Sequence, residues 1–159
     1  MGQDPPTVPG RALGVDLGTR RVGLALSDPQ RIISSPHATI PMTSEASLVT
    51  ALRVLCAERS VSLVVIGLPL SADGSEGPGC VRARRIADAL QTGRVSVALH
   101  DERWSSRDAE DIRRETGKSR RKTARTSATG KMPRGTATGV DAIAASLILS
   151  EYLREVSRP

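Results

Sequence analysis

The spacing of apolar residues changes along this chain from the period of a strand to that of a helix, and this order limits the possible folds. Apolar runs at 12–17 and 21–27 are separated by three residues that include a glycine, which is the length of a hairpin turn. A third strand is expected within 31–40, beginning near the apolar pair Ile32 and Ile33. The first part of the chain therefore predicts three antiparallel strands.

Helices and strands alternate after this point. A helix is expected over about 44–59 with Ser44 as its N-cap, because apolar residues there recur at helical spacing. The continuous apolar run at 62–67 is typical of a buried central strand. A helix at about 79–91 and a strand at 95–100 follow. Helical connections between these strands favour parallel pairing, with the strand at 62–67 beside the first strand of the chain.

The last part of the chain has a different pattern. Ser105 followed by Asp108 is typical of the start of a helix, here about 106–115. Residues 116–138 show no period and are expected to form a mobile loop. A final helix is expected over 139–156. The side chains expected on its buried face are Val140, Ile143, Ala144, Leu147 and Ile148.

These elements predict one α/β domain over residues 11–156, with a five-stranded mixed sheet flanked by helices. The chain of 159 residues is long enough to bury one core. Residues 1–10 are polar and rich in proline, which indicates a disordered tail without the apolar run of a signal peptide. No segment approaches the roughly 20 apolar residues that cross a bilayer. We therefore expect a cytoplasmic protein with no membrane partner, in which Cys56 and Cys80 pack as small hydrophobic side chains.

Three acidic residues lie where strands end or a helix begins. Asp16 ends the first strand, Glu102 follows the strand at 95–100, and Asp141 lies in the first turn of the last helix. Because sites in α/β sheets form outside the carboxyl ends of strands, the three side chains are expected to meet. Gathered carboxylates repel one another unless a cation neutralises them, and Mg²⁺ prefers such oxygens together with phosphate oxygens. The pattern predicts a catalytic site for two Mg²⁺ or Mn²⁺ ions and phosphodiester hydrolysis.

Each acidic residue also has a simpler interpretation when it is taken alone. Asp16 before a glycine is common in turns. Glu102 has Arg103 beside it and could form a surface ion pair. Asp141 is a favourable charge near a helix N-terminus. Only the joint placement of the three favours a metal site.

Positive charge is concentrated in one segment. The net charge is +6, and the segment 118–134 holds seven of the 23 basic residues and no acidic residue. Such localised charge beside a metal site favours a polyanionic partner, and we expect this segment to bind nucleic-acid phosphates. A solvated loop without a partner is the alternative. The seven residues are Lys118, Arg120, Arg121, Lys122, Arg125, Lys131 and Arg134.

Four segments occur together in an order that is specific in combination. They are Gly14-Val15-Asp16-Leu17-Gly18-Thr19, Val65-Ile66-Gly67-Leu68-Pro69, Asp101-Glu102-Arg103 and Val140-Asp141-Ala142-Ile143. Over about residues 11–155 the chain resembles the YqgF-type family, described as pre-16S rRNA nucleases and Holliday-junction-resolvase-like proteins. The resemblance implies an RNase H-like fold with Asp16, Glu102 and Asp141 as acidic active-site residues.

The resemblance implies a metal-dependent endonuclease with two candidate substrates. One is the 5′ end of the 16S rRNA precursor, in ribosome biogenesis. The other is the four-way DNA junction of recombination and repair, whose symmetric cleavage would require a homodimer. One departure is Trp104, which stands where the family usually has leucine.

Two further function classes stay open from the sequence. The segment Asp16-Leu17-Gly18-Thr19 also resembles the phosphate loop of the actin and sugar-kinase superfamily, which would indicate nucleotide binding. A nucleic-acid-binding module without catalysis would use the basic segment alone.

Overall fold

The computed structural model describes residues 10–71, 73–92, 94–102 and 139–157. The predicted helix at 106–115, Trp104, the basic segment and most of the N-terminal tail lie outside these ranges. The described strands are β1 (Arg11–Leu17), β2 (Arg21–Ser27), β3 (Ser34–Pro41), β4 (Val61–Leu68) and β5 (Ser96–Asp101). The described helices are α1 (Glu45–Arg59), α2 (Pro78–Leu90) and α4 (Val140–Val156).

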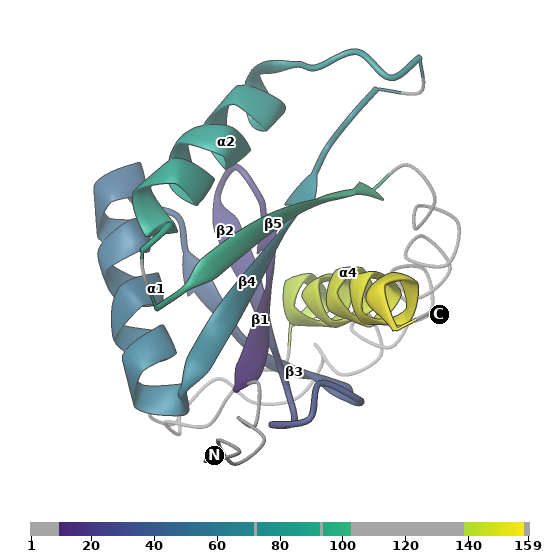
Figure 1. Ribbon diagram of the computed structural model, residues 1–159. Coiled ribbons are helices and arrows are strands. Elements are labelled where there is room, and N and C mark those ends of the chain that lie inside the picture. The colour runs from purple at the N-terminus through teal and green to yellow at the C-terminus, as the bar shows by residue number, and fades with distance from the viewer. Residues whose placement is uncertain (1–9, 72, 93, 103–138, 158–159) are drawn as a thin grey trace, which may run out of the picture.

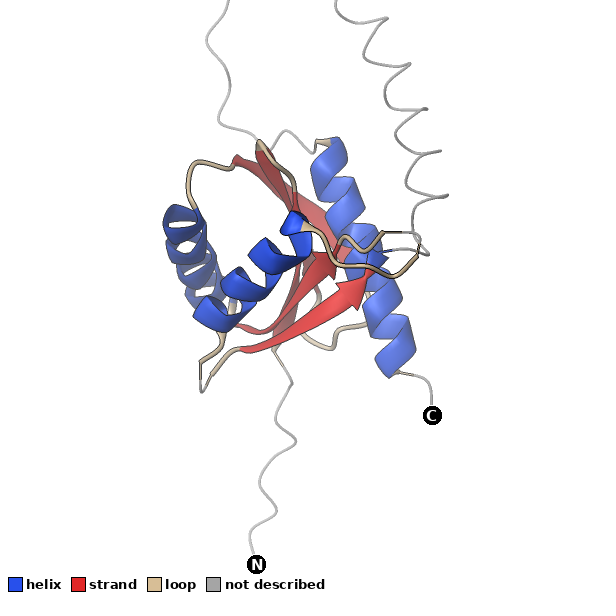
Figure 2. Ribbon diagram, turned by 90° about the horizontal axis from the view of Figure 1, so that it is seen from above, coloured by secondary structure: helices blue, strands red, loops and turns tan. Residues whose placement is uncertain are grey.

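The five strands form one mixed sheet in the order β3-β2-β1-β4-β5. The pairs β1–β2 and β2–β3 are antiparallel, whereas β1–β4 and β4–β5 are parallel. This arrangement confirms the predicted mixed sheet and the predicted pairing of β4 beside β1. The sheet separates α1 and α2 on one face from α4 on the other (Figure 1), and the view from above shows the same two helical layers (Figure 2).

Strand alternation divides the sheet residues between two cores. On β1, Leu13 and Val15 join the larger cluster beneath α1 and α2. Ala12 belongs to the smaller cluster, together with Ala145 and Leu149 of α4. Odd and even positions of the central strands therefore face different helices, and this alternation decides which side chains can meet α4.

The first two helices begin and bury their faces as the sequence predicts. The Ser44 hydroxyl caps α1 by accepting the backbone N–H of Ser47 at 3.1 Å. Both cysteines are buried, as expected: Cys80 is fully buried in α2, and burial raises the pKa of Cys56 to about 11. On the inner face of α2, four residues at helical spacing are buried: Ala83, Ile86, Ala87 and Leu90.

The third strand begins later than expected. Ile32 and Ile33 are 77% and 64% exposed and precede β3, which starts at Ser34. The Asp28 carboxylate accepts the backbone N–H groups of both isoleucines at 2.7 Å. Arg31 has a positive φ of 59° in the same turn. The prediction that the isoleucine pair starts the strand is wrong, because Asp28 closes a turn there.

The predicted buried face of the last helix is also partly wrong. Val140, Ile143 and Leu147 are only half-buried, whereas Ala144 and Ile148 are buried as expected. The buried face is instead made largely of small residues, because the helix lies very close to the sheet. Its buried residues are Ala142, Ala144, Ala145, Ser146, Ile148, Leu149 and Leu153. None of the helices in the described ranges is long and apolar enough to cross a membrane.

Candidate functional site

Asp16 lies on the face of the sheet that α4 covers. It follows Ala12 and Gly14 in the alternation of β1, and a Cβ on Gly14 would meet the Ala145 carbonyl oxygen at 2.7 Å. Asp16 is partly buried and lies opposite Gly23 of β2 in the antiparallel register. Its position at the end of β1 is therefore next to the strand that supports the start of α4.

Gly23 brings the first turn of α4 onto the sheet beside Asp16. A Cβ on Gly23 would lie 1.8 Å from the carbonyl oxygen of Asp141 and 2.2 Å from its carbonyl carbon. No side chain fits at such distances, so the backbone of Asp141 rests directly on β2. Because Gly23 is the cross-strand partner of Asp16, the positions of Asp16 and Asp141 are neighbours.

Gly67 leaves room for the Glu102 side chain, as Gly23 does for the backbone of Asp141, and it lies on the other side of Asp16. Val15 lies opposite Ile66 in the parallel β1–β4 pair, so Asp16 and Gly67 come next on the two strands. A Cβ on Gly67 would lie 1.8 Å from Glu102 Oε1. The Glu102 carboxylate therefore covers Gly67, on the strand that neighbours Asp16.

The three predicted positions thus come to one edge and one face of the sheet, separated by two glycines. Within the described ranges, no three His, Cys, Asp or Glu side chains are gathered closely enough to hold a metal ion. The backbone arrangement therefore brings the three positions to the same edge of the sheet, whereas the carboxylate groups themselves are not gathered around one point. Hard carboxylate oxygens at such an edge are the donor set that Mg²⁺ or Mn²⁺ prefers.

Arg21 forms an ion pair with Asp141 that sequence reasoning missed. Arg21 Nε lies 3.2 Å from Asp141 Oδ2, and the two side chains are 63% and 24% exposed. Arg21 is the first residue of β2, two positions before Gly23, so alternation places it on the α4 face. That alternation is the signal in the sequence for the face that Arg21 occupies, although it does not indicate the partner.

His100 connects the strand that leads to Glu102 with the helix that carries Asp141. Its ring is 7% exposed, with Nε2 lying 3.4 Å from Glu151 Oε2 and Nδ1 lying 3.7 Å from Glu155 Oε2. Tyr152 packs edge-on against the same ring at a centroid distance of 6.1 Å. These contacts fix α4 against β5 two residues before Glu102.

A helix on the opposite face supports the turn that follows Asp16. Arg82 of α2 donates from Nη2 to the carbonyl oxygen of Gly18 at 2.8 Å and approaches that of Leu17 at 3.4 Å. The Gly18 N–H in turn donates to the Arg21 carbonyl oxygen at 2.9 Å, which closes the β1–β2 hairpin. The end of β1 is thus held from both faces of the sheet.

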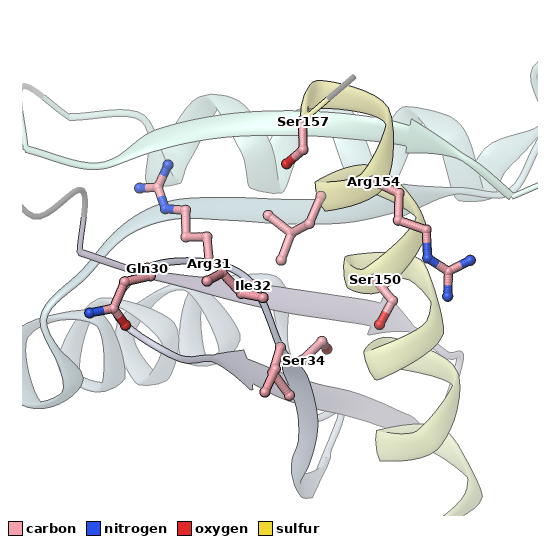
Figure 3. Close-up of a pocket in the computed structure, with 9 residues that line it drawn as sticks. Gln30, Arg31, Ile32, Ser34, Ser150, Arg154 and Ser157 are labelled. Carbon is pink, nitrogen blue, oxygen red and sulfur yellow. The ribbon is translucent and has the colours of Figure 1, made fainter. Parts of the chain in front are cut away.

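A pocket of about 550 Å³ lies elsewhere on the molecule, between the β2–β3 turn and the C-terminal half of α4. None of the three carboxylates lines it. Arg31 and Arg154 both line the pocket, and their side chains point away from one another (Figure 3). Because Asp141 is at the other end of α4, this pocket is separate from the carboxylate edge.

Comparison with known proteins identifies relatives over nearly the whole chain. The family model described as "RuvX: Holliday junction resolvase" matches residues 10–155. A protein of Chloroflexus aggregans named "Putative pre-16S rRNA nuclease" is 36% identical over 142 residues, covering 89% of this chain and 91% of the relative. A Salinibacter ruber protein of the same name is 37% identical over 147 residues, covering 90% and 92%.

Solved structures show the same fold at low sequence identity. T. thermophilus RuvC in complex with Holliday junction substrate has a TM-score of 0.53 at 10% identity, covering 92% of this chain and 95% of that protein. Fowlpox virus resolvase has a TM-score of 0.50 at 10% identity, covering 93% and 99%. The fold is therefore RNase H-like, as the resemblance implied. Because the family model spans almost the whole chain and relatives above 30% identity span about nine tenths of it, the chain belongs to the RuvX, or YqgF-type, family.

Proposed function

We propose that this protein is a divalent-metal-dependent endonuclease in which Asp16, Glu102 and Asp141 hold the metal. Family membership assigns it to the hydrolases that act on phosphodiester bonds. The observation that supports the site is the pair of glycines, Gly23 and Gly67, which leave room for Asp141 and Glu102 on either side of Asp16. Two Mg²⁺ or Mn²⁺ ions are the proposed cofactors.

Each carboxylate has a defined part in this proposal. When bound, the divalent ions would activate the attacking water and stabilise the leaving oxygen. Asp16 lies between the other two positions, so it would hold the metal together with each of them. The rigid end of β1 and the first turn of α4 would keep Asp16 and Asp141 in place, while Glu102 comes from the end of β5. Three carboxylates on such positions would supply binding and orientation without a nucleophilic side chain.

The basic segment 118–134 would hold the nucleic acid. It lies outside the described residues, and its proposed role depends on its charge and on its position between Glu102 and Asp141 in the chain. Seven basic residues can neutralise several backbone phosphates, which makes binding strongly dependent on salt. Binding of this kind recognises the backbone and leaves the choice of sequence to other contacts.

The proposed substrate is the 5′ end of the 16S rRNA precursor. The names of the relatives support it, because both the Chloroflexus aggregans and the Salinibacter ruber proteins are named for pre-16S rRNA. An RNA precursor as substrate implies a cytoplasmic location. The four-way DNA junction is the second candidate, which the description of the family model favours. A junction substrate would also call for a homodimer, since two strands must be cut symmetrically.

The test is cleavage of both substrates by the wild-type protein under identical conditions. A 16S precursor carrying its 5′ leader and a four-way DNA junction are incubated separately with Mg²⁺, with Mn²⁺ and with a chelator. We expect metal-dependent cleavage of the RNA and less cleavage of the junction. Preferential cleavage of the junction would replace the proposed substrate, and a lack of metal-dependent cleavage of either would contradict the proposed nuclease.

Replacing Gly67 by alanine should impair catalysis far more than folding. The new Cβ would lie 1.8 Å from Glu102 Oε1 and 2.9 Å from Ile148 Cδ1, and both atoms are the far ends of flexible side chains. The Glu102 carboxylate would move by about 1 Å or more, which can cost about a hundredfold in rate. The free energy of unfolding should fall by only about 1 kcal/mol.

The measurements are the cleavage rate at saturating metal and the thermal midpoint. Gly77→Ala is the matched control, because a Cβ at Gly77 meets nothing within 4 Å. If Gly67→Ala cleaved at the wild-type rate, the position of the Glu102 carboxylate over Gly67 would not matter for catalysis.

A further inference from the structure

The ion pair between Arg21 and Asp141 has a consequence for how the site acquires its metal. We infer that Arg21 is a cationic placeholder, which neutralises the Asp141 carboxylate in the metal-free protein and competes with the divalent ion for it. This inference rests on the proposed function, because it takes Asp141 as a metal ligand. Arg21 would lower the affinity of the site for metal and would not itself be a metal ligand.

The distances indicate that the Arg21 guanidinium and a divalent ion cannot both bind the same oxygen of Asp141. Arg21 Nε lies 3.2 Å from Asp141 Oδ2. A divalent ion on the same oxygen would lie about 2 Å from it, so the two positive charges would be no more than about 5 Å apart. At that separation their repulsion is appreciable even near a protein surface. Metal binding at Asp141 should therefore displace the guanidinium.

The placement of Arg21 lets that displacement happen without a change of fold. Arg21 begins β2, and its side chain is 63% exposed, so it can turn into the solvent. The backbone of Asp141 cannot move, because it rests on Gly23. The main chain that carries the carboxylate thus stays in place while the cationic partner is exchanged. Exposed ion pairs of this kind are weak, so a divalent ion can replace one.

Arg20 provides a matched control for charge. It precedes Arg21 in the chain and is exposed in the β1–β2 turn, where its carbonyl oxygen accepts the Met42 N–H at 2.8 Å. Arg20→Gln and Arg21→Gln each remove one positive charge from the same end of the sheet. Only the second removes the partner of Asp141. A difference between the two variants therefore reports the ion pair rather than the net charge.

The experiment is a titration of the metal-free protein with Mn²⁺ alone. Binding is measured by calorimetry or by the electron paramagnetic resonance signal of the free ion. We expect Arg21→Gln to bind Mn²⁺ roughly two- to fivefold more tightly than the wild type, the range that an exposed ion pair supplies. Arg20→Gln and the charge-conserving Arg21→Lys should stay near the wild type. The gain should vanish at about 1 M ionic strength, where the Debye length falls to about 3 Å.

Two results would overturn the inference, and they can be told apart. Equal Mn²⁺ affinity of Arg21→Gln and Arg20→Gln would show that Arg21 does not compete with the metal, and would leave the proposed site intact. Undiminished Mn²⁺ binding by both Asp16→Asn and Asp141→Asn would show that the metal does not bind there. That second result would remove the proposed function and the inference together.

Discussion

Replacing Asp16 by asparagine is expected to lower the rate of phosphodiester cleavage by about a thousandfold while the protein stays folded. Asparagine has nearly the same shape, so the packing at the end of β1 changes little. It removes the negative charge at the centre of the three carboxylates, between Gly23 and Gly67. The loss of one ligand charge should cost about 4 kcal/mol of transition-state stabilisation, which corresponds to that change in rate.

The measurement is single-turnover cleavage at saturating Mg²⁺, with the thermal midpoint recorded for the same samples. Asp88→Asn is the matched control, because Asp88 is exposed on α2, on the opposite face of the sheet. It should cleave at the wild-type rate. If Asp16→Asn cleaved as fast as Asp88→Asn, the carboxylate edge would not be the active site.

Replacing Gly23 by alanine is expected to give the largest loss of stability of any single methyl addition considered for this protein. The new Cβ would lie within 1.8–2.9 Å of three backbone atoms of Asp141 and Ala142, and backbone in the first turn of a helix cannot rotate away. The start of α4 would have to lift from β2. We expect a loss of about 3 kcal/mol in the free energy of unfolding, at the upper end for an overpacked core.

That loss should lower the thermal midpoint by about 6–12 °C for a domain of this size. Urea unfolding and calorimetry measure it directly. Gly77→Ala again serves as the control for an added methyl group, since a Cβ there meets no atom within 4 Å; because Gly77 is the N-cap of α2, this variant should lose about 1 kcal/mol, well below the loss for Gly23→Ala. Cleavage should fall as well, because Asp141 moves with the helix. An unchanged midpoint would mean that α4 does not rest on Gly23.

Most of the fold could be predicted because local signals agree with the tertiary packing. Ser44 is a good N-cap and does cap α1. The continuous apolar run of β4 does form an interior strand, between β1 and β5, that is buried on both faces. The helical spacing of Ala83 and Ile86 does mark the buried face of α2. In each case one preference dominates, and no distant contact opposes it.

The errors arise where distant contacts override a local pattern. Apolar residues occur on several sides of α4, so periodicity alone did not select the face. The selection comes from close approach to Gly14 and Gly23, which admits small residues such as Ala142 and Ala145 and leaves Val140 half-exposed. Glycines inside strands were the available signal, since they often mark sites where another backbone approaches.

The sequence predicts the three acidic residues of the candidate site, and their role in catalysis stays a prediction, whereas the residues that support them could not be predicted. The three acidic positions followed from their places at strand and helix ends, and the structure brings these positions to one edge. Arg21 and His100 were missed because their relation to the site depends on packing between α4 and the sheet. A sequence pattern states which face a side chain occupies, and it does not state which partner it finds there.

The position of α4 in the chain has a consequence for when the protein can act. Asp16 is in β1 and Asp141 is in the first turn of α4, so the ribosome makes Asp16 well before Asp141. Because α4 packs on β1, β2 and β3, it can dock only on strands that were made long before it. We expect the proposed nuclease to be inactive in the nascent chain until α4 has left the ribosome and packed on the sheet.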